Sequence, residues 1–375
     1  MKDSLDIVIL GLSITSSWGN GHATTYRALV RALVERGHRV LFLERDARWY
    51  AENRDLPHPP YGETRLYRSL DELRDRFTAA VRVADVVIVG SYVPQGSAVG
   101  AWVTATASGK TAFYDIDTPI TLRNVELGTC EYLCAELMPR YDLYLSFTGG
   151  PVLRAIESKF GVARARALYC SVDPDVYFPE HRATEWDFGY LATYSTDRQA
   201  KLDAMLLGPA RAWREGRFCV AGPQYPADIV WPANVSRVEH LAPSEHRAFY
   251  GSQRFTLNVT RADMVRAGWS PSVRIFEAAA CGTPIVSDAW PGLREFLEPG
   301  REILLARSTE QALAILRNTT DDERQGIAMR ARKRVLAEHT AASRAAALDR
   351  FVRELFEADA SRRGKPRTRA LSEVT

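Results

Sequence analysis

The stretch PSVRIFEAAACGTPIVSDAWPGLREF, residues 271–296, decides the fold of this chain. Its run of small residues predicts a helix that packs closely against a sheet, and Gly282, Thr283 and Pro284 end that helix. A buried strand follows at once, so the stretch is typical of a helix–strand unit in a parallel sheet. Glu277 lies on the helix close to this junction, where a carboxylate is suited to bind sugar hydroxyls.

Short apolar strands alternate with helical stretches along most of the chain, which predicts parallel sheets covered on both faces. In the first half, the sequence predicts a helix over His22–Arg36 and strands at residues 6–13, 39–45, 85–91, 111–117 and 143–148. A segment punctuated by Asp and Pro follows at 167–181. The pattern then restarts, with strands predicted at residues 186–192, 217–221, 236–241, 255–260, 284–289 and 302–306.

These two runs predict an α/β protein of two doubly wound, Rossmann-like domains that face each other across a cleft. We expect helical segments at 309–318, 321–338 and 340–359, the last of which packs back on the first domain and acts in the hinge. We predict an N-terminal domain (1–173), a linker (174–184), a C-terminal domain (185–340), a C-terminal helix (341–360) and a disordered basic tail (361–375).

The composition of the chain excludes several classes of protein. A net charge of +3 over 375 residues does not demand a nucleic-acid partner, and we expect none. The five cysteines are an odd number without a CxxC pair, which argues against a disulfide framework or a metal site. The N-terminus lacks a signal-peptide pattern and no apolar run could span a membrane. We therefore expect a cytoplasmic protein without an integral membrane segment.

The loop SITSSWGNGHATT, residues 13–25, lies between the first predicted strand and the first predicted helix. We expect Asn20 and Gly21 to face the cleft, because glycine allows close backbone approach and the helix N-terminus behind it favours anions. His22 is a candidate catalytic residue that could donate a hydrogen bond there, or it merely caps the helix. An ordinary flexible loop is the alternative.

The same loop permits a dinucleotide-binding interpretation, because Gly19 and Gly21 have the spacing of a Rossmann phosphate loop. Glu44 ends the second strand, about where a ribose-binding acid would lie in an NAD-dependent oxidoreductase. Thr24 departs from that motif, which has glycine at this position, and the loop is longer than the tight turn of the motif.

The segment FYDIDTPITLR, residues 113–123, carries two carboxylates. Asp115 and Asp117 alternate with apolar residues at the end of a predicted strand, so we expect both on one face of the sheet. Asp117 is a candidate catalytic residue that would orient or deprotonate an acceptor hydroxyl. The alternative is that Asp117 only caps the following turn. Asp115 is expected to be a buried partner of a base.

Two further loops follow strands of the second domain. In GYLATYSTDRQAKL, residues 189–202, Arg198 and Lys201 lie three apart on one helix face, beside a helix N-terminus that would stabilise a diphosphate. The alternative is a solvated helix face. Gly222 and Pro223 follow the next strand, and such a turn can approach a flat base without a side-chain clash.

The helix of the opening stretch combines an anion site with a carboxylate. Ser272 begins the helix, and its hydroxyl and the free backbone amides would hold phosphate oxygens. Arg274 adds a cation, and Glu277, on the same face, would accept hydrogen bonds from ribose hydroxyls. The alternative is a surface Arg–Glu pair, but the small residues that follow predict a buried helix, where charge is costly.

Several segments resemble glycosyltransferases of the GT-B fold, in the expected order. SVDPDVYFP (171–179) is similar to the segment that crosses between domains, and RIFEAAACGTPIVSD (274–288) resembles the donor-site helix and strand. FYDIDTP, GWSPS and GLREFLEPGREILL (292–305) resemble the CgeB-like group in particular. The likeness extends over nearly the whole chain, although the N-terminal half matches mainly by pattern.

The resemblance implies a hexosyltransferase-like enzyme that binds a nucleoside diphosphate sugar (UDP, GDP or dTDP) in the second domain and an acceptor in the first. Glu277 would bind ribose, while Arg198 and Lys201 would neutralise the diphosphate, without a bound metal or other cofactor. The acceptor is unspecified: a small molecule, a glycan or a protein. Two positions depart from the pattern: Trp269 replaces a second glutamate of many retaining relatives, and Asp117 stands where related enzymes often place histidine.

We therefore predict a glycosyltransferase that moves a sugar from a nucleoside diphosphate sugar to an acceptor. Two alternatives from other classes stay open. One is the NAD-dependent oxidoreductase, and the other is a non-catalytic sugar- or nucleotide-binding protein of the same fold.

Overall fold

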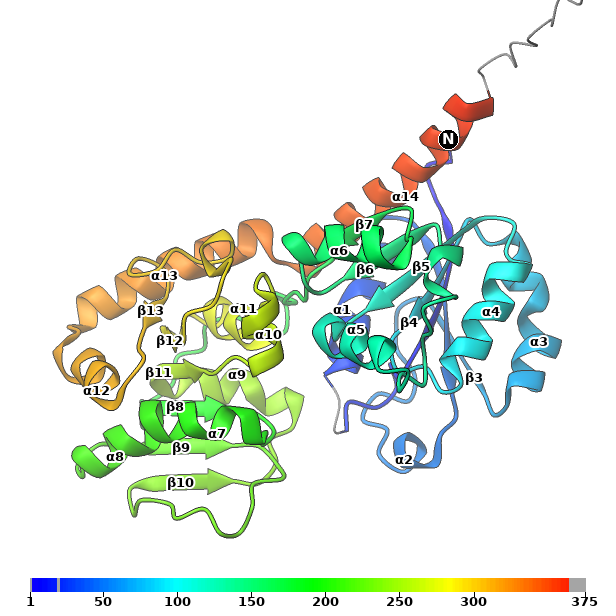
Figure 1. Ribbon diagram of the computed structural model, residues 1–375. Helices are drawn as coiled ribbons and strands as arrows, with labels where there is room; N and C mark the ends of the chain where they lie inside the picture. The colour runs from blue at the N-terminus through cyan, green and yellow to red at the C-terminus, as the bar shows by residue number, and fades with distance from the viewer. Residues whose placement is uncertain (1, 19–20, 364–375) are drawn as a thin grey trace, which may run out of the picture.

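A computed structural model of the chain contains two parallel sheets, each covered by helices on both faces (Figure 1). The structure describes residues 2–18 and 21–363, with the side chains of 362 and 363 left aside. The two sheets belong to two lobes that lie side by side, and the C-terminal helix runs from one lobe to the other. The predicted α/β class with two Rossmann-like domains is confirmed.

The N-terminal sheet has seven parallel strands in the order β3-β2-β1-β4-β5-β6-β7. Its central strands are buried throughout because helices cover both faces, as their Val- and Ile-rich sequences predict. The strands are β1 (Asp6–Gly11), β2 (Arg39–Arg45), β3 (Glu63–Tyr67), β4 (Val86–Gly90), β5 (Lys110–Asp115), β6 (Leu143–Ser146) and β7 (Ala165–Ala167).

The helices of this domain connect successive strands in the right order for a doubly wound fold. Helix α1 ends before Gly37, whose φ of 87° lies in the left-handed region that glycine adopts without strain. The helices are α1 (His22–Glu35), α2 (Arg48–Ala51), α3 (Leu70–Val83), α4 (Gly96–Thr106), α5 (Thr118–Glu126), η1 (Met138–Arg140) and α6 (Pro151–Phe160).

The C-terminal sheet has six parallel strands in the order β10-β9-β8-β11-β12-β13. The strands are β8 (Trp186–Leu191), β9 (Phe218–Ala221), β10 (Val235–Val238), β11 (Gln253–Asn258), β12 (Ile285–Ser287) and β13 (Leu304–Leu305). The helices are α7 (Thr196–Leu202), η2 (Asp203–Leu207), α8 (Gly208–Ala212), α9 (Pro243–Gly251), α10 (Ala262–Ala267), α11 (Val273–Ala280), η3 (Leu293–Glu295), α12 (Thr309–Asn318), α13 (Asp321–Glu338) and α14 (Ala341–Arg363).

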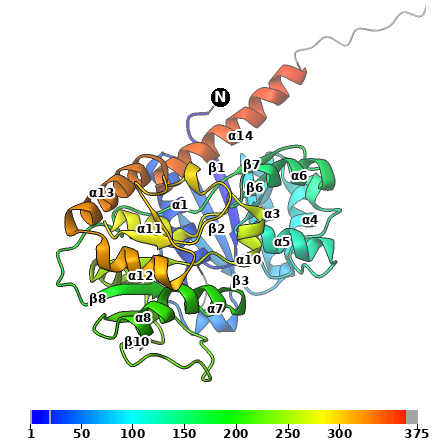
Figure 2. The same cartoon turned by 60° about the vertical axis from the view of Figure 1, so that its left-hand side comes forward.

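Helix α14 leaves the C-terminal lobe and packs against α1 of the N-terminal domain (Figure 2). It extends to Arg363, beyond the predicted end at 360. The predicted disordered tail therefore begins too early, and its remaining part, residues 364–375, lies outside the described residues. No helix in the described part of the chain is long and apolar enough to cross a membrane.

The chain crosses between the lobes twice, and the two crossings are hydrogen-bonded to each other. The amide of Val172 donates to the carbonyl of His339 at 3.0 Å, and the amide of Ala341 donates to the carbonyl of Val172 at 2.9 Å. The buried Arg344 adds hydrogen bonds to the carbonyls of Tyr169 and Glu338. These contacts join the two crossings where α13 meets α14.

The strand predictions were wrong in part. Strands β3 and β7 are not among the predicted strands, because both lie at sheet edges and neither is a long apolar run: Glu63–Tyr67 is mostly polar and Ala165–Ala167 has three residues. The strand predicted through Asp117 ends at Asp115, so the two carboxylates do not share a sheet face; Asp117 instead occupies the residue before helix α5.

Candidate active site between the two domains

A cavity of about 430 Å³ lies between the domains. The N-terminal domain contributes residues from the loop after β1 and from the ends of β5 and β6, while the C-terminal domain contributes the ends of β8, β9, β10 and β11 and the start of α11. Parallel strands bind ligands beyond their carboxyl ends, so the cavity is where the fold predicts a site. The predicted site residues that line it are Gly21, His22, Arg198, Gly222, Pro223, Ser272, Arg274 and Glu277.

Glu277 is buried at the floor of this cavity, on helix α11. The helix can approach the sheet closely because Ala278, Ala279 and Ala280 are fully buried small residues. The hydroxyl of Tyr250 donates to Oε2 of Glu277 at 3.1 Å and holds the carboxylate in place. Tyr177 is a second neutral hydrogen-bonding partner of this carboxylate. A carboxylate has about four acceptor positions, so Glu277 keeps capacity to accept hydrogen bonds from a ligand.

Arg274 also lines the cavity, one turn before Glu277. Its Nε donates to the carbonyl of Leu191 at 2.6 Å, and its Nη1 donates to Oδ1 of Asn258 at 2.8 Å. These neutral partners fix the guanidinium without cancelling its charge. Ser272 takes the predicted place before the helix, and its Oγ accepts from Arg274 rather than capping the helix.

Arg198 lines the cavity in the structure, whereas Lys201 does not. Arg198 lines the cavity, its Nη2 donates to the carbonyl of Thr193, and its buried Nε has no hydrogen-bond partner among the described residues. Burial lowers the pKa of this guanidinium, as does the like charge of Arg274. Lys201 is not among the cavity-lining residues, because its Nζ pairs with Oδ2 of Asp288 at 2.5 Å. Arg198 therefore lines the cavity without Lys201, and their joint binding of a diphosphate stays a prediction.

Gly222 and Pro223 lie at the end of β9, where they line the cavity. Gly222 has a φ of 135°, and a Cβ there would lie 2.0 Å from the carbonyl oxygen of Ala192. The glycine is therefore required by the close approach of two backbone segments. Pro223 is tied to the same loop, because its carbonyl accepts from the amide of Tyr194 at 3.0 Å.

His22 begins helix α1 and faces the cavity from the N-terminal domain. Burial lowers its pKa to about 4, so the imidazole is neutral at pH 7. Its Nδ1 is buried and has no hydrogen-bond partner among the described residues. The edge of its ring meets Tyr92, with the centroids 5.2 Å apart. Gly21 lines the cavity beside it, whereas Asn20 lies outside the described residues.

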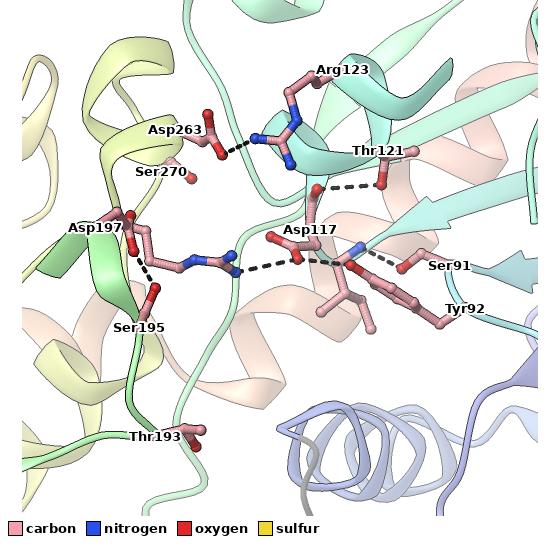
Figure 3. A network of polar contacts seen from close by, with 12 residues as sticks. Ser91, Tyr92, Asp117, Thr121, Arg123, Thr193, Ser195, Asp197, Asp263 and Ser270 are labelled. Atoms are coloured by element: carbon pink, nitrogen blue, oxygen red, sulfur yellow. Dashed lines mark hydrogen bonds and ion pairs between the residues drawn. The ribbon is translucent and has the colours of Figure 1, made fainter. Parts of the chain in front are cut away.

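Asp117 is not among the residues that line the cavity. The hydroxyl of Tyr92 donates to Oδ2 of Asp117 at 2.9 Å (Figure 3), and the same oxygen lies 3.7 Å from Nη1 of Arg261. Oδ1 is buried and has no hydrogen-bond partner among the described residues. The carboxylate makes no capping bond to helix α5, and burial raises its pKa, against the effects of Arg261 and Tyr92.

Asp115 has a structural role, which corrects the expectation that it pairs with a base. Its carboxylate accepts from the hydroxyls of Tyr144 at 2.5 Å and Thr121 at 2.7 Å, and from the amide of Asp117 at 3.2 Å. Burial raises its pKa to about 6. Asp115 thus orders the turn that carries Asp117.

Glu44 is likewise occupied. It accepts from the amides of Ile14 and Thr15 at 2.6 and 2.9 Å, and from the hydroxyls of Ser13 and Thr15 at 3.2 and 2.6 Å. The buried carboxylate holds the loop after β1 and has no free oxygen for a ribose. Glu44, which the oxidoreductase interpretation needs for binding a ribose, therefore holds a loop instead. Gly19, which that interpretation also uses, lies outside the described residues.

Three residues near the site were not predicted to act there. Arg261 lines the cavity, and its long side chain in a loop gave no sequence signal. Tyr92 has a φ of 62°, which a sequence pattern does not reveal. Trp269 lies in the domain interface, where its ring packs against Gly150 and Gly292 and its carbonyl accepts from the amide of Gly149.

Comparison by sequence gives one match to a protein family. Residues 198–350 match the model of a family described as glycosyl transferase-like, which covers most of the C-terminal domain together with the start of α14. No curated protein matches the chain. The described residues contain no group of three or more His, Cys, Asp or Glu side chains that could hold a metal ion.

Comparison by structure gives matches over nearly the whole chain. An α-glucosyltransferase in complex with UDP and a 13-mer DNA is 12% identical, with a TM-score of 0.70 over 94% of this chain and 100% of that one. Sucrose-phosphate synthase from Thermosynechococcus elongatus is 15% identical (TM-score 0.68, 95% and 100%). HepE from Anabaena, in complex with UDP and glucose, is 14% identical (TM-score 0.66, 93% and 100%). The chain therefore has the two-domain GT-B fold.

Proposed function

We propose that this protein is a glycosyltransferase that moves a hexose-like group from a nucleoside diphosphate sugar to a hydroxyl, or another nucleophile, of an acceptor. The observation that carries the proposal is the buried Glu277 in the interdomain cavity, with Arg198 and Arg274 lining the same space. A carboxylate that can accept from two ribose hydroxyls, beside two cations for a diphosphate, matches the chemistry of a nucleotide sugar. The family match at 198–350 covers these residues and supports the proposal.

The departing diphosphate presents the main electrostatic problem of the reaction. Arg198, Arg274 and the N-terminus of α11 would stabilise its negative charge in the interdomain cavity. In this proposal guanidinium groups meet the charge without a divalent cation, so EDTA should leave the transfer rate unchanged. We infer that Lys201, bound to Asp288, supports the loop rather than the phosphate.

The acceptor would enter from the N-terminal domain, where His22 and Asp117 lie close to Tyr92. Both groups have the properties of a proton acceptor: His22 is neutral at pH 7, and the carboxylate of Asp117 has an unpartnered oxygen. We propose Asp117 as the base that takes the acceptor proton, with His22 as a hydrogen-bonding group on the same wall.

We propose UDP as the first nucleotide to test, with GDP and dTDP beside it, because two of the compared structures were solved with UDP. The acceptor panel should include DNA, since one of these structures contains it; with a net charge of +3 we expect no transfer to DNA. The motifs GWSPS and FYDIDTP support placing the chain in the CgeB-like group.

A thermal-shift panel tests the proposal. A nucleoside diphosphate or its sugar conjugate should raise the melting temperature, since it binds the folded state, while NAD and NADP should not. Glu277→Ala should abolish the shift and leave the fold intact by circular dichroism. Absence of a response to UDP, GDP and dTDP would overturn the proposal, and a response to NAD alone would favour the oxidoreductase. Binding without release of UDP from a UDP-sugar, with any acceptor, would instead favour a non-catalytic binding protein.

A further inference from the structure

The backbone on both sides of Arg261 is held at the cavity wall by two carboxylates. The amide of Thr260 donates to Oδ1 of Asp288 at 3.0 Å, and the amide of Ala262 donates to Oδ2 of Asp197 at 2.6 Å. These bonds fix the loop after β11 on both sides of Arg261 and direct its side chain into the cleft. A rigid support of this kind is typical of a residue that positions a ligand.

Three guanidinium groups share the wall of the cavity: those of Arg198, Arg261 and Arg274. They are close enough to affect one another, because burial first, and then Arg274 and Arg261, lower the pKa of Arg198. Glu277 is the carboxylate among the described lining residues, so the lining carries an excess of positive charge that an anion would relieve.

The ion-pair partner of Arg261 comes from the opposite domain. Its Nη1 lies 3.7 Å from Oδ2 of Asp117, a loose pair in which the arginine side chain is 38% exposed and the aspartate 15%. Lys201, by contrast, is tied at 2.5 Å to a carboxylate of its own domain. Arg261 is therefore the cation that can leave its partner at lower cost.

Resting on the proposed function, we propose that Arg261 is a diphosphate-binding residue that exchanges partners: it pairs with Asp117 when the donor site is empty and turns to the diphosphate when the donor binds. The cavity that Arg261 lines is continuous with Arg198, Ser272 and Arg274, so the guanidinium reaches the same ligand space. The exchange leaves the carboxylate of Asp117 with Tyr92 alone, and so frees it for the acceptor in the donor complex.

Such an exchange makes Asp117 and the diphosphate competitors for one cation. By linkage, the ion pair that must be broken weakens donor binding, and removing the charge of Asp117 should strengthen it. A residue that only supported the cavity would give the opposite result, because its loss would weaken binding or leave it unchanged.

A double-mutant cycle tests the exchange, with the dissociation constants of UDP, GDP and dTDP measured by calorimetry. Asp117→Asn should tighten binding of the preferred nucleotide by roughly two- to fivefold, the range expected for a partly exposed ion pair. Arg261→Gln should weaken it, and in that background Asp117→Asn should have no further effect. Asp263→Asn is the control for loosening of the domains, because it breaks the ion pair with Arg123, which also joins the domains but does not line the cavity. It also breaks the pair between Asp263 and Arg266 within α10.

The outcomes separate the exchange from the proposed function. The exchange is supported if Asp117→Asn tightens binding in the wild-type background but not in the Arg261→Gln background. Asp263→Asn should not tighten binding. Wild-type protein that binds a nucleoside diphosphate, together with an Asp117→Asn variant of unchanged or weaker affinity, overturns the exchange alone. Equal tightening in Asp263→Asn also overturns it, since loosening of the domains would then be the cause. A wild-type protein that binds none of the three nucleotides overturns the exchange and the proposed function together.

Discussion

At the scale of single residues, Tyr92 shows how local strain serves the site. A bulky residue with a φ of 62° is uncommon and costs on the order of 1–3 kcal/mol. This backbone geometry brings the Tyr92 hydroxyl to 2.9 Å from Oδ2 of Asp117 and its ring to the edge of His22. The strained residue therefore links the two candidate catalytic groups, and neither link could be predicted from the sequence.

Tyr92→Phe tests this link through the pH dependence of sugar transfer. The hydroxyl lowers the pKa of Asp117 against the larger effect of burial, so its removal should raise that pKa further. The proposed role of Asp117 as a base requires the ionised carboxylate, so the acid limb of the kcat/KM profile should move to higher pH. Tyr67→Phe is the control, because the Tyr67 hydroxyl on β3 has no hydrogen-bond partner among the described residues. An unshifted acid limb would remove Asp117 from the role of base.

At the scale of elements, the loops that follow the strands of the second domain place the site, and Gly222 is the position most sensitive to change. With a φ of 135°, and with the carbonyl oxygen of Ala192 in the way of a Cβ, Gly222→Ala should destabilise the domain by about 2 kcal/mol or more. Donor affinity should fall with it. Gly21→Ala is the control, since nothing lies within 4 Å of its Cβ position. Equal stability of the two variants in urea would contradict this account.

The sequence predicted the elements far better than the contacts between them. Apolar runs separated by helical periods were enough to predict two parallel sheets, because strands buried on both faces carry that pattern. The pattern also led to Glu277 and Arg274, since small residues beside charge are rare on a surface helix. It could not show that Lys201 forms an ion pair with Asp288, or that Glu44 accepts a hydrogen bond from the amide of Ile14. Each of these contacts joins residues that are distant in the chain.

At the scale of the whole molecule, His339 joins the domain crossings to helix α11. The ring of His339 stacks on Phe276 of α11, with the centroids 4.6 Å apart, while Arg344 donates to its Nδ1 at 2.9 Å. Burial lowers the pKa of His339 to about 3, from 6.5 in the unfolded chain. Between these values the unfolded state binds more protons, so the free energy of unfolding falls as the pH falls below 6.5.

His339→Phe should reduce this pH dependence, because phenylalanine keeps the ring on Phe276 but does not titrate. We expect the free energy of unfolding that is lost between pH 6.5 and 4.5 to be smaller in the variant by about 2 kcal/mol. This figure follows from about 1.36 kcal/mol for each pH unit between the two pKa values. Some dependence should remain from His22, whose pKa is also low. Urea denaturation at several pH values measures the slope. An unchanged slope would mean that His339 is not the group that titrates.

A crystal structure of the protein with UDP would show whether the interdomain cavity binds a nucleotide sugar through helix α11, as we propose. The account predicts the ribose hydroxyls within hydrogen-bond distance of Glu277 and the diphosphate between Arg198, Arg274 and the start of α11. UDP bound away from this cavity, or bound in it with its ribose away from Glu277, would contradict the account.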